Sequence, residues 1–77
     1  MDISANSQYD KKISDPRLAE IKKKCLECGT MMVATGTMYH SRLTSDWFIE
    51  YWCTDDQEMF YIWNPEYEAL TAEIAAQ

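Results

Sequence analysis

Cysteine and acidic residues recur in this 77-residue chain at spacings that suit a metal ion. The first group is the segment CLECG, residues 25–29, with cysteines at positions 25 and 28. Two intervening residues let one tight turn present two thiolates to a tetrahedral ion, and glycine after the second cysteine permits the backbone conformation of such a turn. Zinc is the usual ion for these soft ligands, so the segment predicts half of a zinc site.

The segment YWCTDD, residues 51–56, supplies the second half of the same pattern. It contains Cys53, but Asp56 stands where a matching cysteine would complete the set. A carboxylate oxygen is an accepted yet harder zinc ligand, so a site with three sulfurs and one oxygen would be weaker than one with four sulfurs. Asp55 and Glu58 lie close enough in sequence to compete for the role. The alternative is an empty site, in which Cys25, Cys28 and Cys53 are ordinary half-buried thiols.

The composition indicates one small acidic domain in a reducing compartment. A chain of this length buries a modest core, and many such domains gain stability from a metal or from disulfides. Three cysteines cannot all pair with one another, and residues 1–14 contain no apolar run, so we expect neither a disulfide framework nor a leader. No stretch of about 18 apolar residues occurs, so no membrane span is expected. We therefore expect a cytoplasmic protein.

The charge of the chain indicates which classes of binding partner are favoured. Thirteen acidic residues against seven basic ones give a net charge of −6, which works against nonspecific binding to nucleic acids. Five lysines nevertheless fall in the first third of the chain, where a solvated helix face is the expected explanation: Lys11, Lys12, Lys22, Lys23 and Lys24.

Local patterns predict a small α+β fold. Residues 1–14 are polar and aperiodic, so we expect a disordered lead-in, with residues 15–77 forming a single domain. Asp15 and Pro16 are a helix start signal, and they predict a short helix that ends near Lys24. Residues 30–39, 46–53 and 58–64 predict three antiparallel strands, with Gly36 as a bulge. Asn64 and Pro65 then precede a predicted C-terminal helix over residues 66–77.

Alternation along the second strand predicts which side chains face the core. One set contains Trp47, Ile49, Tyr51 and Cys53, and the other set contains a charge at Glu50, so the first set is expected to be buried. We expect the opposite sheet face to carry Phe48, Trp52, Phe60 and Ile62. That face needs a cover, which either the C-terminal helix or a partner protein can provide.

The two cysteine turns and the strand-length spacing between them resemble the zinc ribbon family, over roughly Cys25 to Trp63. The resemblance implies one structural zinc clamped between two turns at the end of a three-stranded sheet. Cys25, Cys28 and Cys53 match the ligand positions of the family, and Asp56 occupies the fourth position with a different residue type. His40 is disfavoured as a substitute, because it lies near the far turn of the predicted hairpin.

No catalytic set or phosphate-binding loop is recognisable in the sequence. We expect a non-catalytic zinc-ribbon-like module for protein–protein interaction, a regulator or assembly accessory of a larger cellular or viral machine. Its partner would bind the aromatic sheet face or the acidic C-terminal helix, and a homodimer is possible. A nucleic-acid-binding ribbon is the alternative, and dithiol chemistry at residues 25–28 is a weaker one.

Overall fold

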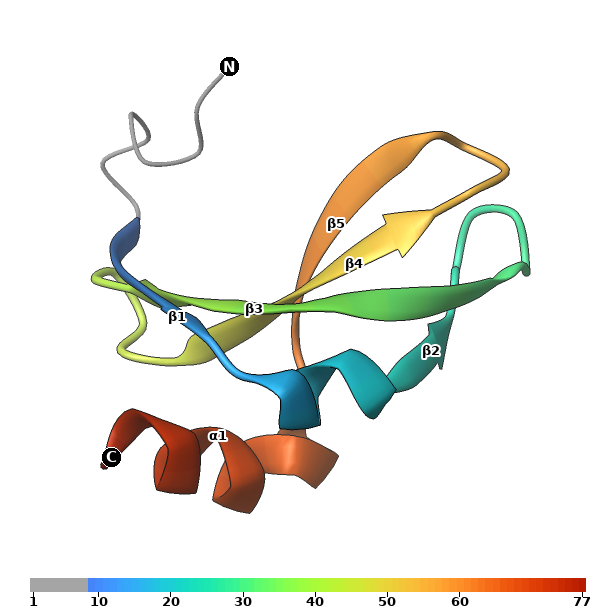
Figure 1. Ribbon diagram of the computed structural model, residues 1–77. Coiled ribbons are helices and arrows are strands. Elements are labelled where there is room, and N and C mark those ends of the chain that lie inside the picture. The colour runs from blue at the N-terminus through green and yellow to red at the C-terminus, as the bar shows by residue number, and fades with distance from the viewer. Residues whose placement is uncertain (1–8) are drawn as a thin grey trace.

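The computed structural model describes residues 9–77, which form one antiparallel sheet with helical segments on one side (Figure 1). Strands β1 (Tyr9–Ser14), β2 (Lys22–Lys24), β3 (Met31–Ser41), β4 (Trp47–Cys53) and β5 (Glu58–Trp63) make up the sheet. The helical segments are the 3-10 helices η2 (Pro16–Glu20) and η3 (Pro65–Tyr67) and the α-helix α1 (Glu68–Ala75). The α+β class is confirmed, but the sheet has five strands where three were predicted.

The long strand β3 organises the sheet. Its eleven residues pair with β4 along one side, and with both β1 and β2 along the other. β1 pairs with residues 37–41 and β2 with residues 31–33, so the two short strands share one edge. Residues 9–14, which were predicted to be disordered, therefore form a strand, because β3 is long enough to offer them backbone partners. The remainder of the predicted lead-in, residues 1–8, lies outside the described residues.

The N-terminal helix predicted over residues 15–24 is wrong beyond its first turn. Asp15 does cap that turn, since its Oδ1 accepts a hydrogen bond of 2.8 Å from the backbone N–H of Arg17. After Glu20 the chain becomes extended, and the carbonyl of Ile21 accepts a hydrogen bond of 3.0 Å from the N–H of Ala34. Pairing with β3 gives residues 22–24 better backbone partners than a short, weakly nucleated helix would.

Gly36 forms the predicted irregularity in β3. Its φ of +96° suits glycine, and the register with β4 shifts between Ala34 and Met38. The Gly36 carbonyl also accepts a hydrogen bond of 2.8 Å from the N–H of Asp15, and a Cβ at Gly36 would meet Ala19 at 3.7 Å. The bulge therefore lets η2 pack directly against the sheet.

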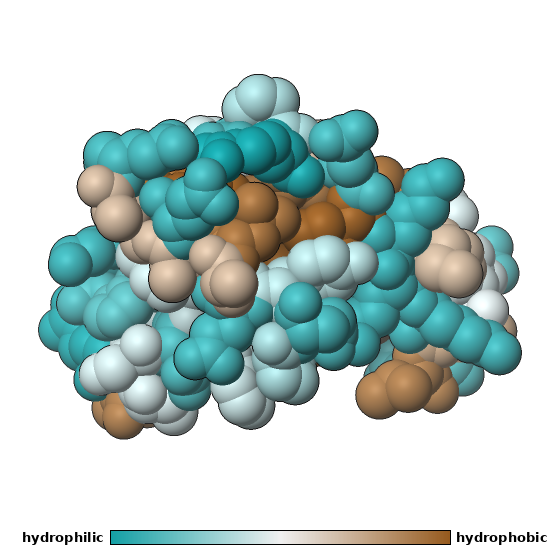
Figure 2. All heavy atoms as spheres, turned by 90° about the horizontal axis from the view of Figure 1, so that it is seen from below, coloured by the Kyte–Doolittle hydropathy of each residue, from teal (hydrophilic) through white to brown (hydrophobic). Residues whose placement is uncertain are grey.

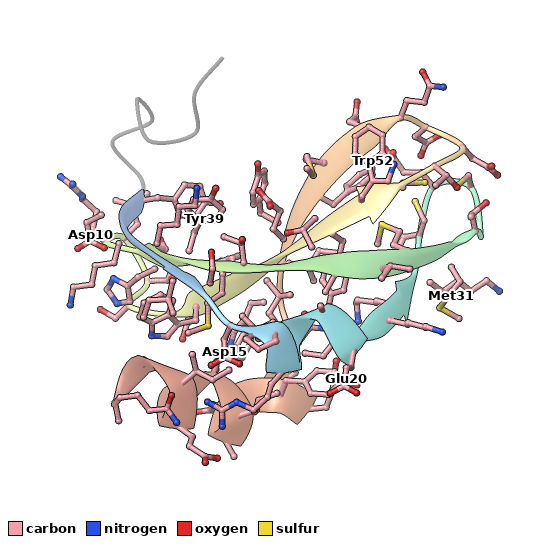
Figure 3. The ribbon with its side chains drawn as sticks, in the orientation of Figure 1. Asp10, Asp15, Glu20, Met31, Tyr39 and Trp52 are labelled. Carbon is pink, nitrogen blue, oxygen red and sulfur yellow. The ribbon has the colours of Figure 1, made fainter. Side chains whose placement is uncertain are left out.

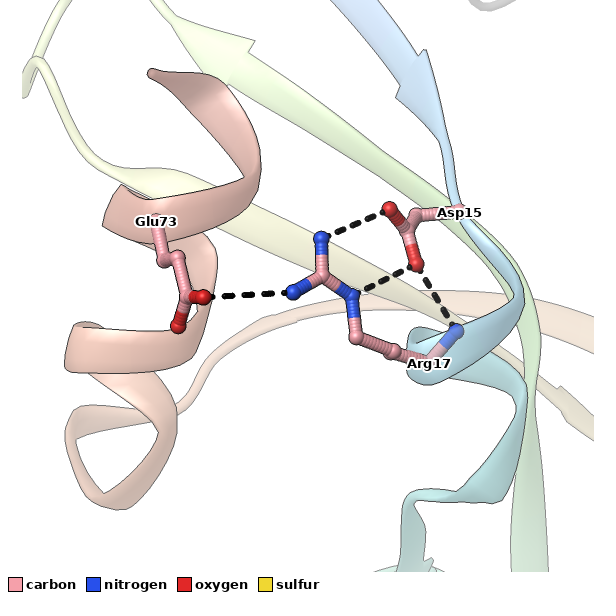
Figure 4. A network of polar contacts seen from close by, with 3 residues as sticks. All are labelled: Asp15, Arg17 and Glu73. Atoms are coloured by element: carbon pink, nitrogen blue, oxygen red, sulfur yellow. Dashed lines mark hydrogen bonds and ion pairs between the residues drawn. The ribbon is translucent and has the colours of Figure 1, made fainter. Parts of the chain in front are cut away.

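An ion-pair network joins η2 to α1 on the same side of the sheet (Figure 4). The Arg17 guanidinium lies 3.0 Å from Asp15 Oδ2 and 3.4 Å from Glu73 Oε1. Hydrogen bonds from Arg17 lower the pKa of Asp15 below its usual value. The side of the molecule that carries η2 and α1 is largely hydrophilic, with one elongated apolar strip between polar side chains (Figure 2).

The core lies between the sheet and these helical segments. Three apolar residues of the helical side pack on Met38, Ile49 and Tyr51 of the sheet. They are Leu18 in η2, Ile21 directly after η2, and Ile74 in α1. Ile49, Tyr51 and Cys53 are fully buried, which confirms the predicted core-facing set of β4 in these three positions. Phe60 and Ile62 stand opposite Tyr51 and Ile49 in the β4–β5 register, so the prediction that they lie on the other face is wrong.

The other face of the sheet, which we name the open face, carries aromatic side chains and no helix (Figure 3). Tyr9, Tyr39, Phe48 and Tyr61 pack together with ring centroids 5.4–6.1 Å apart. Tyr39 and Trp52 lie on the side of the sheet away from α1 (Figure 3). The C-terminal helix therefore covers the core face, and Phe48 and Trp52 lie on the open face as predicted. No helix in the described part of the chain is long and apolar enough to cross a membrane.

Tyr51 links the sheet to the start of the C-terminal helical segment. Its buried hydroxyl donates a hydrogen bond of 2.8 Å to Asn64 Oδ1, and the Asn64 amide donates one of 2.8 Å to Glu66. Tyr51→Phe leaves Asn64 Oδ1 buried without a partner, so we expect a loss of about 1–3 kcal/mol in the free energy of unfolding, measured with urea.

Burial also raises the pKa of Tyr51 above that of an unfolded tyrosine, which is about 10. The free energy of unfolding of the wild type should therefore fall above about pH 10, and more steeply than that of Tyr51→Phe.

The matched control is Tyr67→Phe, at a half-buried tyrosine whose hydroxyl makes no hydrogen bond within residues 9–77. An equal loss of stability in both variants would show that removal of any tyrosine hydroxyl, not the Asn64 contact, causes the effect.

Candidate metal centre

Two turns bring the predicted ligands to one end of the sheet. The first turn, residues 25–29, joins β2 to β3, and the second, residues 53–57, joins β4 to β5. Val33 near the start of β3 pairs with Trp52 near the end of β4, so both turns lie at the same end of the antiparallel pair. They are the two loops at the right-hand end of the sheet in Figure 1. The predicted placement of the cysteines is therefore confirmed.

The two turns share a backbone feature although their sequences differ. Gly29 follows Cys28 with φ +79°, and Gln57 follows Asp56 with φ +50°. Within the first turn the N–H of Gly29 donates a 2.9 Å hydrogen bond to the carbonyl of Cys25. The left-handed conformation favours glycine, and Gln57 adopts it at the equivalent position. The second turn thus has a left-handed residue directly after Asp56, as the first turn has one directly after Cys28.

The four ligand atoms lie together in a compact group. The sulfurs of Cys25, Cys28 and Cys53 and a carboxylate oxygen of Asp56 are all within 4.8 Å of one another. The Sγ atoms of Cys28 and Cys53 are 3.4 Å apart, and Cys25 Sγ lies 3.7 Å from Asp56 Oδ2. Bonds of about 2.3 Å from zinc to sulfur place tetrahedral thiolates about 3.8 Å apart, so these separations fit one ion.

Burial divides the four ligands into two pairs. Cys25 and Cys53 are buried against the core, whereas Cys28 and Asp56 are exposed. The N–H of Asp56 acts to lower the pKa of Cys53, but burial and the neighbouring thiols outweigh it and raise that pKa to about 11. Hydrogen bonds from the hydroxyl and backbone of Thr30 lower the pKa of Cys28. The same hydroxyl also contacts Asp55, and its single proton can serve only one of them at a time.

The competing acidic residues are not part of the group. Asp55 Oδ2 accepts the hydrogen bond from Thr30, which ties the second turn to the first. Glu58 begins β5 opposite Cys53, outside the group of four. Sequence reasoning missed Thr30 and Gln57, since neither residue type is a metal ligand. The signal available in the sequence is position: Gln57 follows Asp56 as Gly29 follows Cys28, and Thr30 comes directly after Gly29.

His40 lies at the other end of the strands, as predicted. It pairs with Trp47 at the start of β4, whereas Cys53 ends that strand. Its Nδ1 lies 2.7 Å from Asp10 Oδ1, and its ring packs on the Trp47 indole with centroids 5.1 Å apart. His40 is therefore a structural residue between β1 and β4.

The donor set can hold a metal ion such as zinc. Three thiols and one carboxylate supply four ligands, the coordination number of structural zinc sites. The sulfurs of Cys28 and Cys53 span the two turns at 3.4 Å, well beyond a disulfide bond of about 2.05 Å. A metal there would join the β2–β3 turn to the β4–β5 turn.

Comparison with protein-family models, with curated proteins and with solved structures finds no match to this chain. Of the predicted arrangement, the structure has Cys25, Cys28, Cys53 and Asp56 on two turns at one end of a sheet, while strands β1 and β2 depart from the predicted three strands.

Asp56→Cys tests whether the fourth position faces the ion. The backbone of the second turn already has the required left-handed residue, so a fourth thiolate should complete a softer ligand set. We expect zinc affinity to rise by about tenfold or more, measured by competition with a chromogenic chelator. The matched control is Asp55→Cys, which places a thiol one residue away and should leave the affinity unchanged. Equal gains in both variants would contradict the assignment of Asp56.

Proposed function

We propose that this chain is a non-catalytic protein-binding module whose sheet is closed at one end by a structural zinc ion. The observation that carries the proposal is the convergence of Cys25, Cys28, Cys53 and Asp56 within 4.8 Å from two turns of similar backbone shape. A regulator or assembly accessory of a larger machine fits a small module of this kind.

The ligand count supports a structural role for the metal. Catalytic zinc keeps a position open for water or substrate, whereas four protein ligands close the coordination sphere. Two of the four ligands are buried in the core, so the ion would anchor both turns to the sheet. A chain of 77 residues has a small core, for which such an anchor is a large contribution.

The exposed apolar side chains support protein binding. Trp52, Met59 and Trp63 remain 38–44% exposed, and register places all three on the open face. Tryptophan, tyrosine and methionine are enriched in the cores of protein interfaces. The same face carries the four packed rings of Tyr9, Tyr39, Phe48 and Tyr61.

The position of the lysines does not favour the nucleic-acid alternative. Lys11 and Lys12 belong to β1, and Lys22–Lys24 make up β2, so all five follow one edge of the sheet. Lys12 Nζ lies 5.9 Å from the centroid of the Tyr39 ring, at the margin of the open face. Stacking of bases on aromatic residues works together with a basic groove along the same surface.

The test of the metal is elemental analysis of protein purified without added metal or chelator. We expect close to one zinc per chain, and removal of zinc with a chelator should lower the melting temperature. A folded, cooperatively melting protein that contains no zinc and gains no stability from added zinc would overturn the metal part of the proposal.

A further inference from the structure

The two edges of the sheet differ sharply in chemistry. β1 and β2 form one edge, which carries Lys11, Lys12 and the three lysines of β2, and β1 has a register shift between Tyr9 and Lys11. Lysines and bulges on an edge strand prevent another strand from pairing with it. This explains the basic cluster of the first third of the chain, which was predicted to be a helix face and is instead a protected edge.

The opposite edge, β5, has none of these protections. Its sequence EMFYIW contains no lysine and no proline, and all six residues pair with β4 without a register shift. Within the described chain β4 is the only strand that pairs with β5, so the outer backbone groups of β5 have no strand partner (Figure 1). An unprotected apolar edge is a template for strand addition.

The charge around β5 indicates what kind of partner strand could pair with this edge. Residues 43–77 contain eight acidic residues and no lysine, arginine or histidine. Asp55 lies in the turn before β5 and Glu58 begins the strand, whereas Glu66 and Glu68 belong to η3 and α1. Glu66 has an intramolecular cation, Lys23 at 3.7 Å, whereas Glu58 and Glu68 form no ion pair within residues 9–77. The end of β5 next to the candidate metal centre is thus acidic, whereas the contact with Lys23 places Glu66 beside β2.

We propose that β5 binds an extended basic segment of a partner protein by strand addition. The inference rests on the proposed function, because it names the partner class of the protein-binding module. Backbone hydrogen bonds would join the segment to β5, and its alternate apolar side chains would pack on Met59 and Trp63, which are 42% and 44% exposed. Lysine or arginine near one end of the segment would face Asp55 and Glu58, at the start of β5. A second copy of this chain is disfavoured, because it would bring two acidic halves together.

Selection from a displayed library of random twelve-residue peptides tests the proposal with zinc-loaded wild-type protein. We expect the selected peptides to alternate apolar residues and to contain lysine or arginine, and their affinity should fall as salt rises. On binding, amide hydrogen exchange in Glu58–Trp63 should slow at least tenfold. Peptides that are acidic, or that leave exchange in β5 unchanged, would overturn the proposal, as would a failure to select any peptide.

Matched variants separate the edge from other surfaces. Met59→Lys places a protecting lysine on β5 and is expected to weaken peptide binding at least tenfold. Met31→Lys makes the same change at a 56% exposed methionine on β3 and should have no effect. Glu58→Gln keeps the shape of an exposed side chain and should weaken binding and reduce its salt dependence, so the test does not depend on Met59→Lys being folded. Equal affinity in all three variants would contradict the proposal.

Two further measurements keep the outcomes distinct. Sedimentation of the protein alone should show a 9.0 kDa monomer, and a dimer with protected β5 amides would overturn the basic segment in favour of a second copy. Zinc content is measured on the same samples. A protein that binds peptides at β5 but contains no zinc would refute the metal site and leave the strand-addition inference standing. A protein that contains zinc but binds no peptide at β5 would refute only the strand-addition inference.

Discussion

Cys28→Ser is expected to abolish stoichiometric zinc binding and to lower the melting temperature by roughly 15–30 °C at saturating zinc. The magnitude follows from linkage, since zinc at about 1,000 times its dissociation constant stabilises the folded state by about 4 kcal/mol. For a domain of this size each kcal/mol shifts the melting temperature by about 4–8 °C. Differential scanning calorimetry with and without added zinc measures the effect.

Cys28 is the informative ligand to replace because its side chain is exposed. Serine in its place removes a thiolate without leaving a cavity in the core, unlike substitution of the buried Cys25 or Cys53. The variant should therefore melt at the same temperature as wild-type protein stripped of zinc. A Cys28→Ser protein that responds to zinc as the wild type does would exclude Cys28 from the site.

Leu18→Ala is expected to lower the free energy of unfolding by about 2–5 kcal/mol. Leu18 is fully buried, and it is the residue of η2 that inserts between the sheet and α1. Its removal would leave a cavity beneath the bulge at Gly36, because η2 is held there by a backbone hydrogen bond from Asp15 and has little freedom to collapse inward. Urea denaturation of the zinc-loaded protein gives the change in stability.

Leu43→Ala is the matched control for this variant. Leu43 lies in the turn between β3 and β4 and is 76% exposed, so the same substitution should change stability by no more than about 0.5 kcal/mol. Comparable losses at Leu18 and Leu43 would show that η2 does not contribute the packing described here. Zinc content should be unchanged in both variants, since neither residue is a ligand.

Much of the metal centre was predictable because its ligands lie in two short local patterns. The C-x-x-C-G turn and the second pattern ending at Asp56 depend on nearest neighbours, and the antiparallel pair β3 and β4 between them returns the chain to the same end. Strands β3, β4 and β5 and the C-terminal helix followed from alternation, from turn residues and from Pro65. These features are encoded by spacing within a few residues.

The errors have a common physical cause, which is competition from distant backbone partners. Residues 22–24 were predicted to be helical from local periodicity, but the unpaired side of β3 offered them a strand register. The same long strand captured residues 9–14, which have no strong pattern of their own. A strand of three lysines carries almost no local signal in the sequence. Its formation depends on the length of β3 and on the bulge at Gly36, which are properties of a distant segment.

The register between β4 and β5 determined which side chains of β5 face the core, and the strand order determined which strands form the two edges of the sheet. Phe60 and Ile62 alternate with Met59 and Tyr61, and sequence alternation alone does not show which pair turns to the core when both are apolar. Pairing of Phe60 with Tyr51 settles it and leaves Met59 and Trp63 on the open face. The sequence by itself determined the candidate ligands, most of the strands and the charge of each half. Only the tertiary structure decided that the lysines protect one edge while β5 stays open, because an edge is a property of strand order and not of any local segment.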